Sequence, residues 1–148
     1  MQRGQIELEH TVVIAGAGPL GLGMVDAVDE VLKLTEGYGC DVYVEATSHP
    51  AAVEQGLHMI CKLGTFVEFS VMREPVTVDW NIIGDTKELD IHGAHLSPHC
   101  YPIAIDMLAK GLLPMDQILT HRLPLENFHE GIDLVAAGDH SIKVSLAP

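Results

Sequence analysis

The residues best suited to chemistry lie between Thr11 and Gly23, where the sequence reads TVVIAGAGPLGLG. An apolar run leads into a G-x-G-x-x-G arrangement made by Gly16, Ala17, Gly18, Pro19, Leu20 and Gly21. In such a pattern Gly16 makes a tight turn, Gly18 lets the backbone approach phosphates, and Gly21 lets a helix pack closely on a strand. Free N–H groups at the helix start attract anions. The stretch therefore predicts a dinucleotide pyrophosphate site; the alternative is a tight strand-to-helix turn with no ligand.

Strands and helices are expected to alternate around this turn. The expected strands are 11–15, 41–46, 65–71, 89–94, 118–123 and 142–146, and the expected helices are 19–35, 49–61, 101–110 and 125–137, with an extended piece at 76–80 and one or two helical turns at 81–87. The helix 101–110 is expected to turn Ile103, Met107 and Leu108 inward. This alternation predicts an α/β fold, a shortened Rossmann-like parallel sheet with flanking helices.

Composition limits the kinds of partner that the chain can bind and the cellular compartments in which it is expected. The 148 residues suit one domain, and the net charge of -13 repels phosphate backbones, so no nucleic-acid partner is expected. No apolar run approaches ~18 residues and the first ten residues are polar, so neither a membrane span nor a secretory signal is expected. The three cysteines form no C-x-x-C. They encode no disulfide framework or four-cysteine zinc lobe, which favours a cytoplasmic location.

Three polar residues follow or end predicted strands, at the edge where open α/β sheets bind ligands. Thr47 and Ser70 are candidates to hydrogen-bond a nucleotide, or they only cap the following helix or turn. Glu45 lies 29 residues after Gly16 and could bind a ribose as a late acidic residue. The usual acid follows the glycines by about 20 residues. Glu36 and Asp41 fall nearer that spacing, but neither is expected at the carboxyl end of a strand.

A histidine-rich segment, HGAHLSPHC, invites a metal interpretation through His92, His95, His99 and Cys100. Closed zinc sites usually combine ligands from two local clusters, and the sequence offers no second cluster. A loop with surface histidines is the favoured interpretation, so no metal ligands are assigned. No catalytic residues are assigned either, because a nucleophilic triad is defined by spatial proximity.

Five segments follow one another along nearly the whole chain: GAGPLGLGMV, LTEGYGCDVYVEAT, HPAAVEQGLHMICKLGTFVEFSV, VTVDWNIIGDTKELDIHGAH and ILTHRLPLENFHEGIDLV. They resemble the cofactor-binding half of zinc-dependent medium-chain dehydrogenases/reductases, with the polyol dehydrogenases of sorbitol and threitol type most similar. The resemblance implies an NAD- or NADP-binding Rossmann-like domain over residues 1–116. It implies that 117–148 returns to the family's catalytic domain, and that the domain assembles into homo-oligomers.

Two departures from the family limit what the resemblance implies. The family's N-terminal domain, which carries its zinc ligands, has no counterpart, and no zinc ligands are recognised here. Family members have roughly 40 further residues at the point where Val25 is followed directly by Asp26 in this chain. This block amounts to about one βαβ unit of ~30 residues plus part of a helix. That block would hold the ribose-binding acid, so weak dinucleotide binding is expected. By the resemblance, Glu45 belongs to another strand on the other side of the first, which is the interpretation we favour.

The leading hypothesis is the NAD(P)-binding portion of a zinc-dependent alcohol or polyol dehydrogenase, inactive as this chain alone. The alternative is a non-catalytic oligomerisation or interaction domain derived from that fold. A third hypothesis places S-adenosylmethionine at Gly16–Gly21 with Glu45 on its ribose, but no methyl-transfer motif accompanies it. Two questions stay open: on which side of the first strand the second one pairs, and whether the chain joins two separated pieces.

Overall fold

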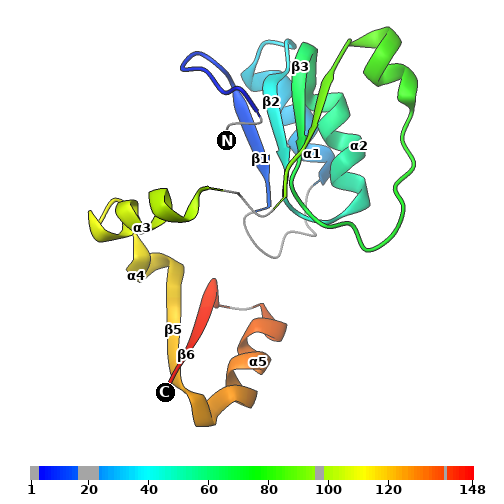
Figure 1. Cartoon of the computed structure of the whole chain (residues 1–148). Coiled ribbons are helices and arrows are strands. Elements are labelled where there is room, and N and C mark those ends of the chain that lie inside the picture. The colour runs from blue at the N-terminus through cyan, green and yellow to red at the C-terminus, as the bar shows by residue number, and fades with distance from the viewer. Residues whose placement is uncertain (1–3, 17–23, 96–98, 139) are drawn as a thin grey trace. The chain divides into compact units, whose positions relative to one another are not determined.

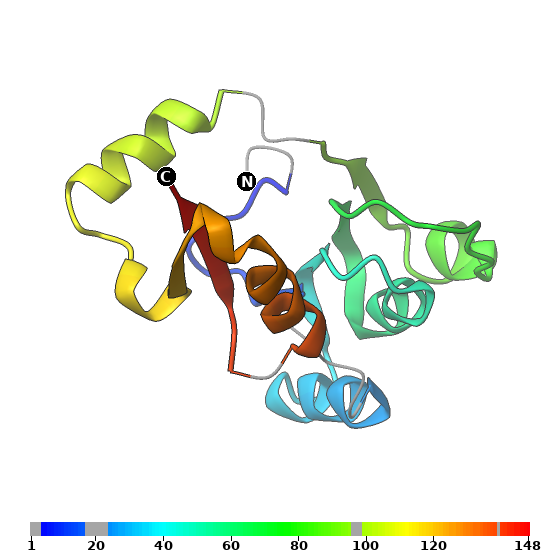
Figure 2. The ribbon, with the colours of Figure 1, turned by 90° about the horizontal axis from the view of Figure 1, so that it is seen from below.

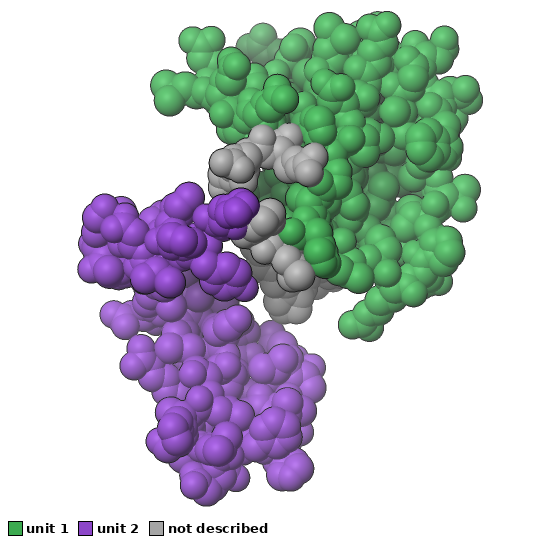
Figure 3. All heavy atoms as spheres, in the orientation of Figure 1, with its two compact units in different colours: residues 1–96 green, residues 97–148 purple. Residues whose placement is uncertain are grey.

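The computed structural model describes residues 4–16, 24–95, 99–138 and 140–148 (Figure 1). The chain divides into two compact units, Met1–Leu96 and Ser97–Pro148, which Figure 3 colours separately. This boundary falls before the 101–110 helix, whereas the sequence suggested a division between residues 116 and 117. The division at 116 concerns a return to the family's catalytic domain, which the two compact units do not test. It stays a prediction.

The first unit is built on a four-stranded parallel sheet in the order β1-β2-β3-β4. Its elements are β1 (Val12–Ala15), α1 (Met24–Leu34), β2 (Cys40–Glu45), α2 (Pro50–Met59), β3 (Ile60–Glu68), the π-helix η1 (Ile82–Thr86) and β4 (Asp90–Gly93). The predicted α/β fold with a parallel sheet is therefore confirmed. Each strand pairs with its predecessor, so β2 lies directly beside β1.

Helices α1 and α2 both pack against one face of the sheet and form one apolar cluster with it. Val28 and Val31 of α1, together with Val53 of α2, pack against the cluster that contains Tyr43 and Phe66. Crossovers between parallel strands are almost always right-handed, so strands that advance in one direction place their helices on one face. On the opposite face, Gly4 of the N-terminal segment lies against Val42 and Val67.

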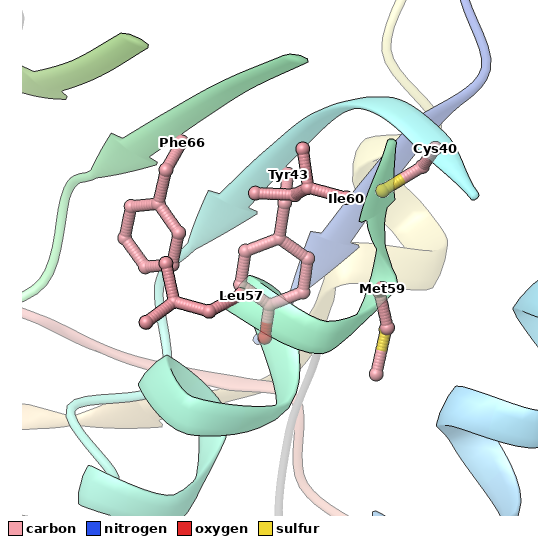
Figure 4. Packing of buried hydrophobic residues seen from close by; sticks show 6 residues of the cluster. All are labelled: Cys40, Tyr43, Leu57, Met59, Ile60 and Phe66. Carbon is pink, nitrogen blue, oxygen red and sulfur yellow. The ribbon is translucent and has the colours of Figure 1, made fainter. Parts of the chain in front are cut away.

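The centre of the cluster is Tyr43, whose ring lies between sheet and helix (Figure 4). Its centroid is 5.4 Å from that of Phe66, and its hydroxyl donates to the Ala52 carbonyl at 2.8 Å. A Cβ at position 56 would lie 2.3 Å from this ring. The close approach of α2 to β2 therefore requires Gly56.

Helix α2 begins as predicted, after His49 and at Pro50, but ends earlier than predicted. His49 Nδ1 accepts a hydrogen bond from the Ala51 amide at 3.3 Å, which caps the helix start. The expected helix end at residue 61 is wrong, because β3 already begins at Ile60. Ile60 pairs with Cys40 before the register of the two strands shifts. Strand pairing thus replaces the last helical turn.

Lysine 87 holds the end of α2 in place. Its Nζ donates to the carbonyl oxygens of Leu57, His58 and Ile60 at 2.7, 2.9 and 2.6 Å. These are carbonyls that a helix C-terminus leaves without an intrahelical donor, and a cation there is favoured by the helix dipole. Burial lowers the pKa of Lys87 from its ordinary value. The expected helical turns at 81–87 appear as η1, while the expected extended piece at 76–80 forms no strand.

The second unit contains a two-stranded parallel pair covered by a helix (Figure 2). Its elements are α3 (Tyr101–Ala109), α4 (Met115–Ile118), β5 (Leu119–Pro124), the 3-10 turn η2 (Leu125–Asn127), α5 (Phe128–Ala137) and β6 (Lys143–Ala147). Helix α5 ends at Gly138, whose φ of +63° is the left-handed value that glycine adopts at a helix end. The crossover from β5 through α5 to β6 repeats the β-α-β arrangement of the first unit.

The expectation that α3 turns three apolar residues inward is wrong for two of them, while the third, Met107, is half-buried. Ile103 is 61% exposed and Leu108 is 43% exposed, and no residue of α3 is buried. The apolar spacing correctly predicted a helix but not which of its apolar side chains are covered. As for the membrane expectation, no helix among the described residues combines the length and apolar character that a membrane span requires.

Candidate functional site

The carboxyl ends of the parallel strands gather the candidate residues at one edge of the first unit's sheet. Gly16 follows β1, Glu45 ends β2 and Glu68 ends β3, with Ala15, Glu45 and Glu68 in register across the three strands. The Ala46 amide donates to the Ala15 carbonyl at 2.8 Å and continues the pairing past the strand ends. Ligands of open α/β sheets bind at this edge.

Gly16 occupies a position that only glycine suits. Its φ is +128°, and a Cβ there would lie 2.5 Å from the Ala46 carbonyl oxygen. A side chain would thus be strained by the backbone angle and would also clash with the neighbouring strand. Four other predicted site residues lie outside the described residues: Gly18, Pro19, Leu20 and Gly21. Their contact with phosphates stays a prediction.

The structure brings Glu45, Thr47 and Ser70 together. Glu45 is completely buried, at 0% exposed. Its Oε1 accepts from the Thr47 amide at 2.7 Å and from the Thr47 hydroxyl at 2.5 Å, and its Oε2 accepts from the Ser70 hydroxyl. Thr47 Oγ1 in turn accepts from the His49 amide at 2.9 Å. The second interpretation of Thr47, as a residue that shapes the turn before α2, therefore describes part of its role.

Glu68 joins this group, although the sequence analysis did not single it out. Its Oε1 lies 2.9 Å from Ser70 Oγ, so Ser70 contacts both carboxyl groups. Burial raises the pKa of Glu68, and the charge of Glu45 contributes to the rise, while the Ser70 hydroxyl opposes it. The position of each glutamate near the end of a strand was a signal for this pair in the sequence. Only the register of β2 and β3 places the two residues side by side.

A surface cavity of about 420 Å³ adjoins this group on the α2 side. It is lined by Thr47, Ser48, His49, Pro50, Arg73 and Glu74. Arg73 offers a cationic fork suited to oxyanions, in a chain whose net charge is strongly negative. The described residues that fit a dinucleotide are therefore the Gly16 turn, the Thr47 and Ser70 hydroxyls and this cavity.

The described residues offer no comparable set of ligands for a metal ion. Among residues 4–16, 24–95, 99–138 and 140–148, no three His, Cys, Asp or Glu side chains form a group that could hold one. His92 belongs to β4 in the first unit, whereas His99 and Cys100 belong to the second. The described residues thus do not fit zinc.

Comparison with known proteins gives consistent results. The sequence profile of the family described as zinc-binding dehydrogenase matches residues 8–110. The chain is 46% identical, over its whole length, to erythritol/L-threitol dehydrogenase of Mycolicibacterium smegmatis, of which it covers 51%. It is 28% identical to D-arabitol-phosphate dehydrogenase of Enterococcus avium, with 98% of this chain and 52% of that protein covered.

Solved structures show the same fold. The chain superposes on 2R,3R-butanediol dehydrogenase of Bacillus subtilis with a TM-score of 0.85 at 18% identity, covering 99% of this chain and 53% of that one. A short-chain alcohol dehydrogenase of Escherichia coli, solved with NADH, gives a TM-score of 0.80 at 23% identity, with 99% and 55% covered. At these identities the likeness concerns the fold alone.

The chain spans about half the length of the curated relatives it matches over its whole length. The alignment with the Mycolicibacterium smegmatis protein is 186 positions long, while the chain supplies 148 residues, so 38 aligned positions have no residue from this chain. That number is close to the block of roughly 40 residues, a βαβ unit and part of a helix, expected from the sequence. The place of the block after Val25 stays a prediction.

Proposed function

The chain belongs to the zinc-binding dehydrogenase family, and from this premise we propose that it is the NAD(P)-binding portion of a zinc-dependent alcohol or polyol dehydrogenase, inactive as this isolated chain. The observation that carries the proposal is the Gly16 turn at the carboxyl edge of a parallel sheet, closed against Ala46. When bound, the nicotinamide cofactor accepts or supplies a hydride. The chain itself contributes binding and orientation of that cofactor.

Named residues divide the proposed binding task. The backbone from Gly16 through Gly18, Pro19 and Leu20 to Gly21 would hold the pyrophosphate, since amides at a helix start attract anions. Thr47 and Ser70, at the ends of neighbouring strands, would border the nucleoside. Glu45 would act on the ribose or through these hydroxyls. An NADH-bound alcohol dehydrogenase among the similar folds supports NAD or NADP as the ligand.

Two relatives named for polyols or polyol phosphates support a polyol dehydrogenase as the whole protein. Weak binding by this chain is part of the proposal, because the strand that would end in the usual ribose acid has no counterpart. A cytoplasmic location and assembly into a homo-oligomer complete the proposal. Both rest on the family resemblance.

The test is a calorimetric titration of the full chain with NADH, beside the variant Gly18→Leu and the matched variant Gly84→Leu. A side chain at position 18 would block the approach of phosphates, whereas a Cβ at position 84 meets nothing within 4 Å. We expect weak binding by the wild type and by Gly84→Leu, and none by Gly18→Leu. A wild type that does not bind contradicts the proposal, and unchanged binding by Gly18→Leu assigns the turn a structural role only. Affinity in the low micromolar range contradicts the expected loss of the ribose contact.

An interaction domain is the second candidate, favoured by the exposed apolar side chains of α3. Ile103 and Ile105 are 61% and 63% exposed, and Tyr101 is 73% exposed. Exposed apolar clusters of this kind commonly mark protein interfaces. Light scattering at several concentrations tests it, and a monomer at every concentration rules it out.

A further inference from the structure

The buried carboxylate of Glu45 has hydrogen-bond donors but no cationic partner among the described residues. Ion pairs among the described residues join Lys33 to Glu30 and Lys110 to Asp106, and neither involves Glu45 or Glu68. An isolated charge in the interior is costly unless it is paired or well hydrogen-bonded. The donors that satisfy Glu45 are the Thr47 amide and the hydroxyls of Thr47 and Ser70.

The Ser70 hydroxyl lies between the two carboxyl groups and has too few protons to serve both. Ser70 Oγ lies within hydrogen-bond distance of Glu45 Oε2 and of Glu68 Oε1. A serine hydroxyl carries one proton, and an ionised carboxylate only accepts. If both glutamates were ionised, one of the two contacts would join two oxygens with no hydrogen between them. Neighbouring carboxylates avoid this repulsion when one of them holds a proton.

We propose that Glu45 is a positioning residue, which fixes the hydroxyls of Thr47 and Ser70 at the binding edge, and that Glu45, Ser70 and Glu68 share one additional proton that keeps this group together. One carboxyl group donates to the Ser70 oxygen, and the Ser70 hydroxyl donates to the other carboxylate. The proposal rests on the proposed function, because the edge that the group organises is the one assigned to the dinucleotide.

No cation among the described residues forms an ion pair with either carboxyl group: Arg73, which lines the adjoining cavity, is exposed and pairs with neither of them. The neighbouring edges of β1 and β4 place Ala15 and Gly93 in register with the pair. Tyr43, on the same face of β2, is neutral at ordinary pH, and burial raises its pKa further. On α2 the titratable side chains are Glu54 and His58, and both are exposed.

The proposal has a defined pH signature. A carboxyl group whose pKa is raised by folding stays protonated in the folded state while the unfolded chain already ionises. The folded protein then binds more protons, so stability falls as the pH rises from the ordinary carboxyl pKa through the raised pKa of Glu68. Below the ordinary pKa both states are protonated, and the pair imposes no penalty.

The variant Glu68→Gln tests this signature, because its amide donates to the Ser70 oxygen at any pH. Melting temperatures of the full chain are measured from about pH 4 to 8, a range that begins near the ordinary glutamate pKa. We expect the difference between Glu68→Gln and the wild type to grow in favour of the variant as the pH rises. The matched variant Glu54→Gln also removes one negative charge, and its difference should stay nearly constant. A Glu68→Gln profile that parallels Glu54→Gln overturns the shared proton.

A second measurement needs no variant and covers the case in which Glu68→Gln does not fold. Infrared spectra of the wild type should retain the carbonyl band of a protonated carboxyl group at a pH where exposed glutamates are ionised. If this band disappears at the same pH as the carbonyl bands of the exposed glutamates, the proposal is overturned.

The NADH affinity of two Thr47 variants tests the positioning role of Glu45. Thr47→Ser keeps the hydroxyl that Glu45 holds, whereas Thr47→Val removes it. One good hydrogen bond corresponds to about tenfold in affinity. We expect about that loss in Thr47→Val and none in Thr47→Ser, and equal affinities overturn the positioning role. If the wild type binds no NADH at all, the proposed function fails and the positioning role with it, while the stability profile still decides the shared proton.

Discussion

The two units of the chain use the same β-α-β arrangement and reach very different degrees of burial. Every buried apolar side chain among the described residues belongs to the first unit, in which four strands and two helices enclose Tyr43 and Leu57. In the described part of the second unit the one buried residue is Gly131. A single crossover over two strands has too few layers to enclose a core, whereas three or more strands with packed helices do. The described residues of this chain thus form one unit with its own apolar core and one unit without such a core.

Thiol reactivity should show the largest difference between the units. Burial raises the pKa of Cys40 to about 12 and also raises that of Cys61, while Cys100 of the second unit is only half-buried. A rise of three pKa units lowers the reactive thiolate fraction about 1,000-fold at neutral pH. We expect a thiol reagent to modify Cys100 first, as identified by peptide mass spectrometry. In denaturant all three should react alike, and equal native rates for Cys40 and Cys100 would contradict the difference in burial.

Added methyl groups should separate the units by stability. A Cβ at Gly56 would lie 2.3 Å from the Tyr43 ring, while one at Gly131 would lie 3.3 Å from the end of the Leu146 side chain. Overpacking costs up to about 3 kcal/mol, against which alanine gains about 1 kcal/mol in helix propensity. We expect Gly56→Ala to lose about 2 kcal/mol in urea unfolding and Gly131→Ala to change little. Gly84→Ala, where a Cβ meets nothing within 4 Å, is the control in the first unit.

Removal of one hydroxyl should give the smallest effect. The Tyr43 hydroxyl donates to the Ala52 carbonyl in the core, whereas Tyr101 of the second unit is 73% exposed. A buried hydrogen bond contributes about 1 kcal/mol, so Tyr43→Phe should lower the unfolding free energy by that amount. Tyr101→Phe should leave it unchanged. Equal losses in the two variants would show that the units do not differ in the way their burial indicates.

Most elements were predictable from local pattern, and the errors have physical causes. The apolar run at Val12–Ala15, the cap at His49 and the stop at Gly138 all depend on neighbouring residues. The early end of α2 depends instead on the pairing of Ile60 with Cys40, a contact between strands. The exposed face of α3 reflects the layers available around a helix, which its own periodicity does not reveal.

The sequence alone determined the class of fold, the family and the glycine turn, because periodicity, turn residues and motif spacing act over short distances along the chain. Only the tertiary structure decided the strand order and the meeting of Glu45, Ser70 and Glu68. Glu45 ends β2, whereas Glu68 ends β3 and Ser70 follows it, and their contact depends on a register that is set by the packing of Tyr43 and Phe66 against α2. A shift of one residue would turn each glutamate to the other face of the sheet.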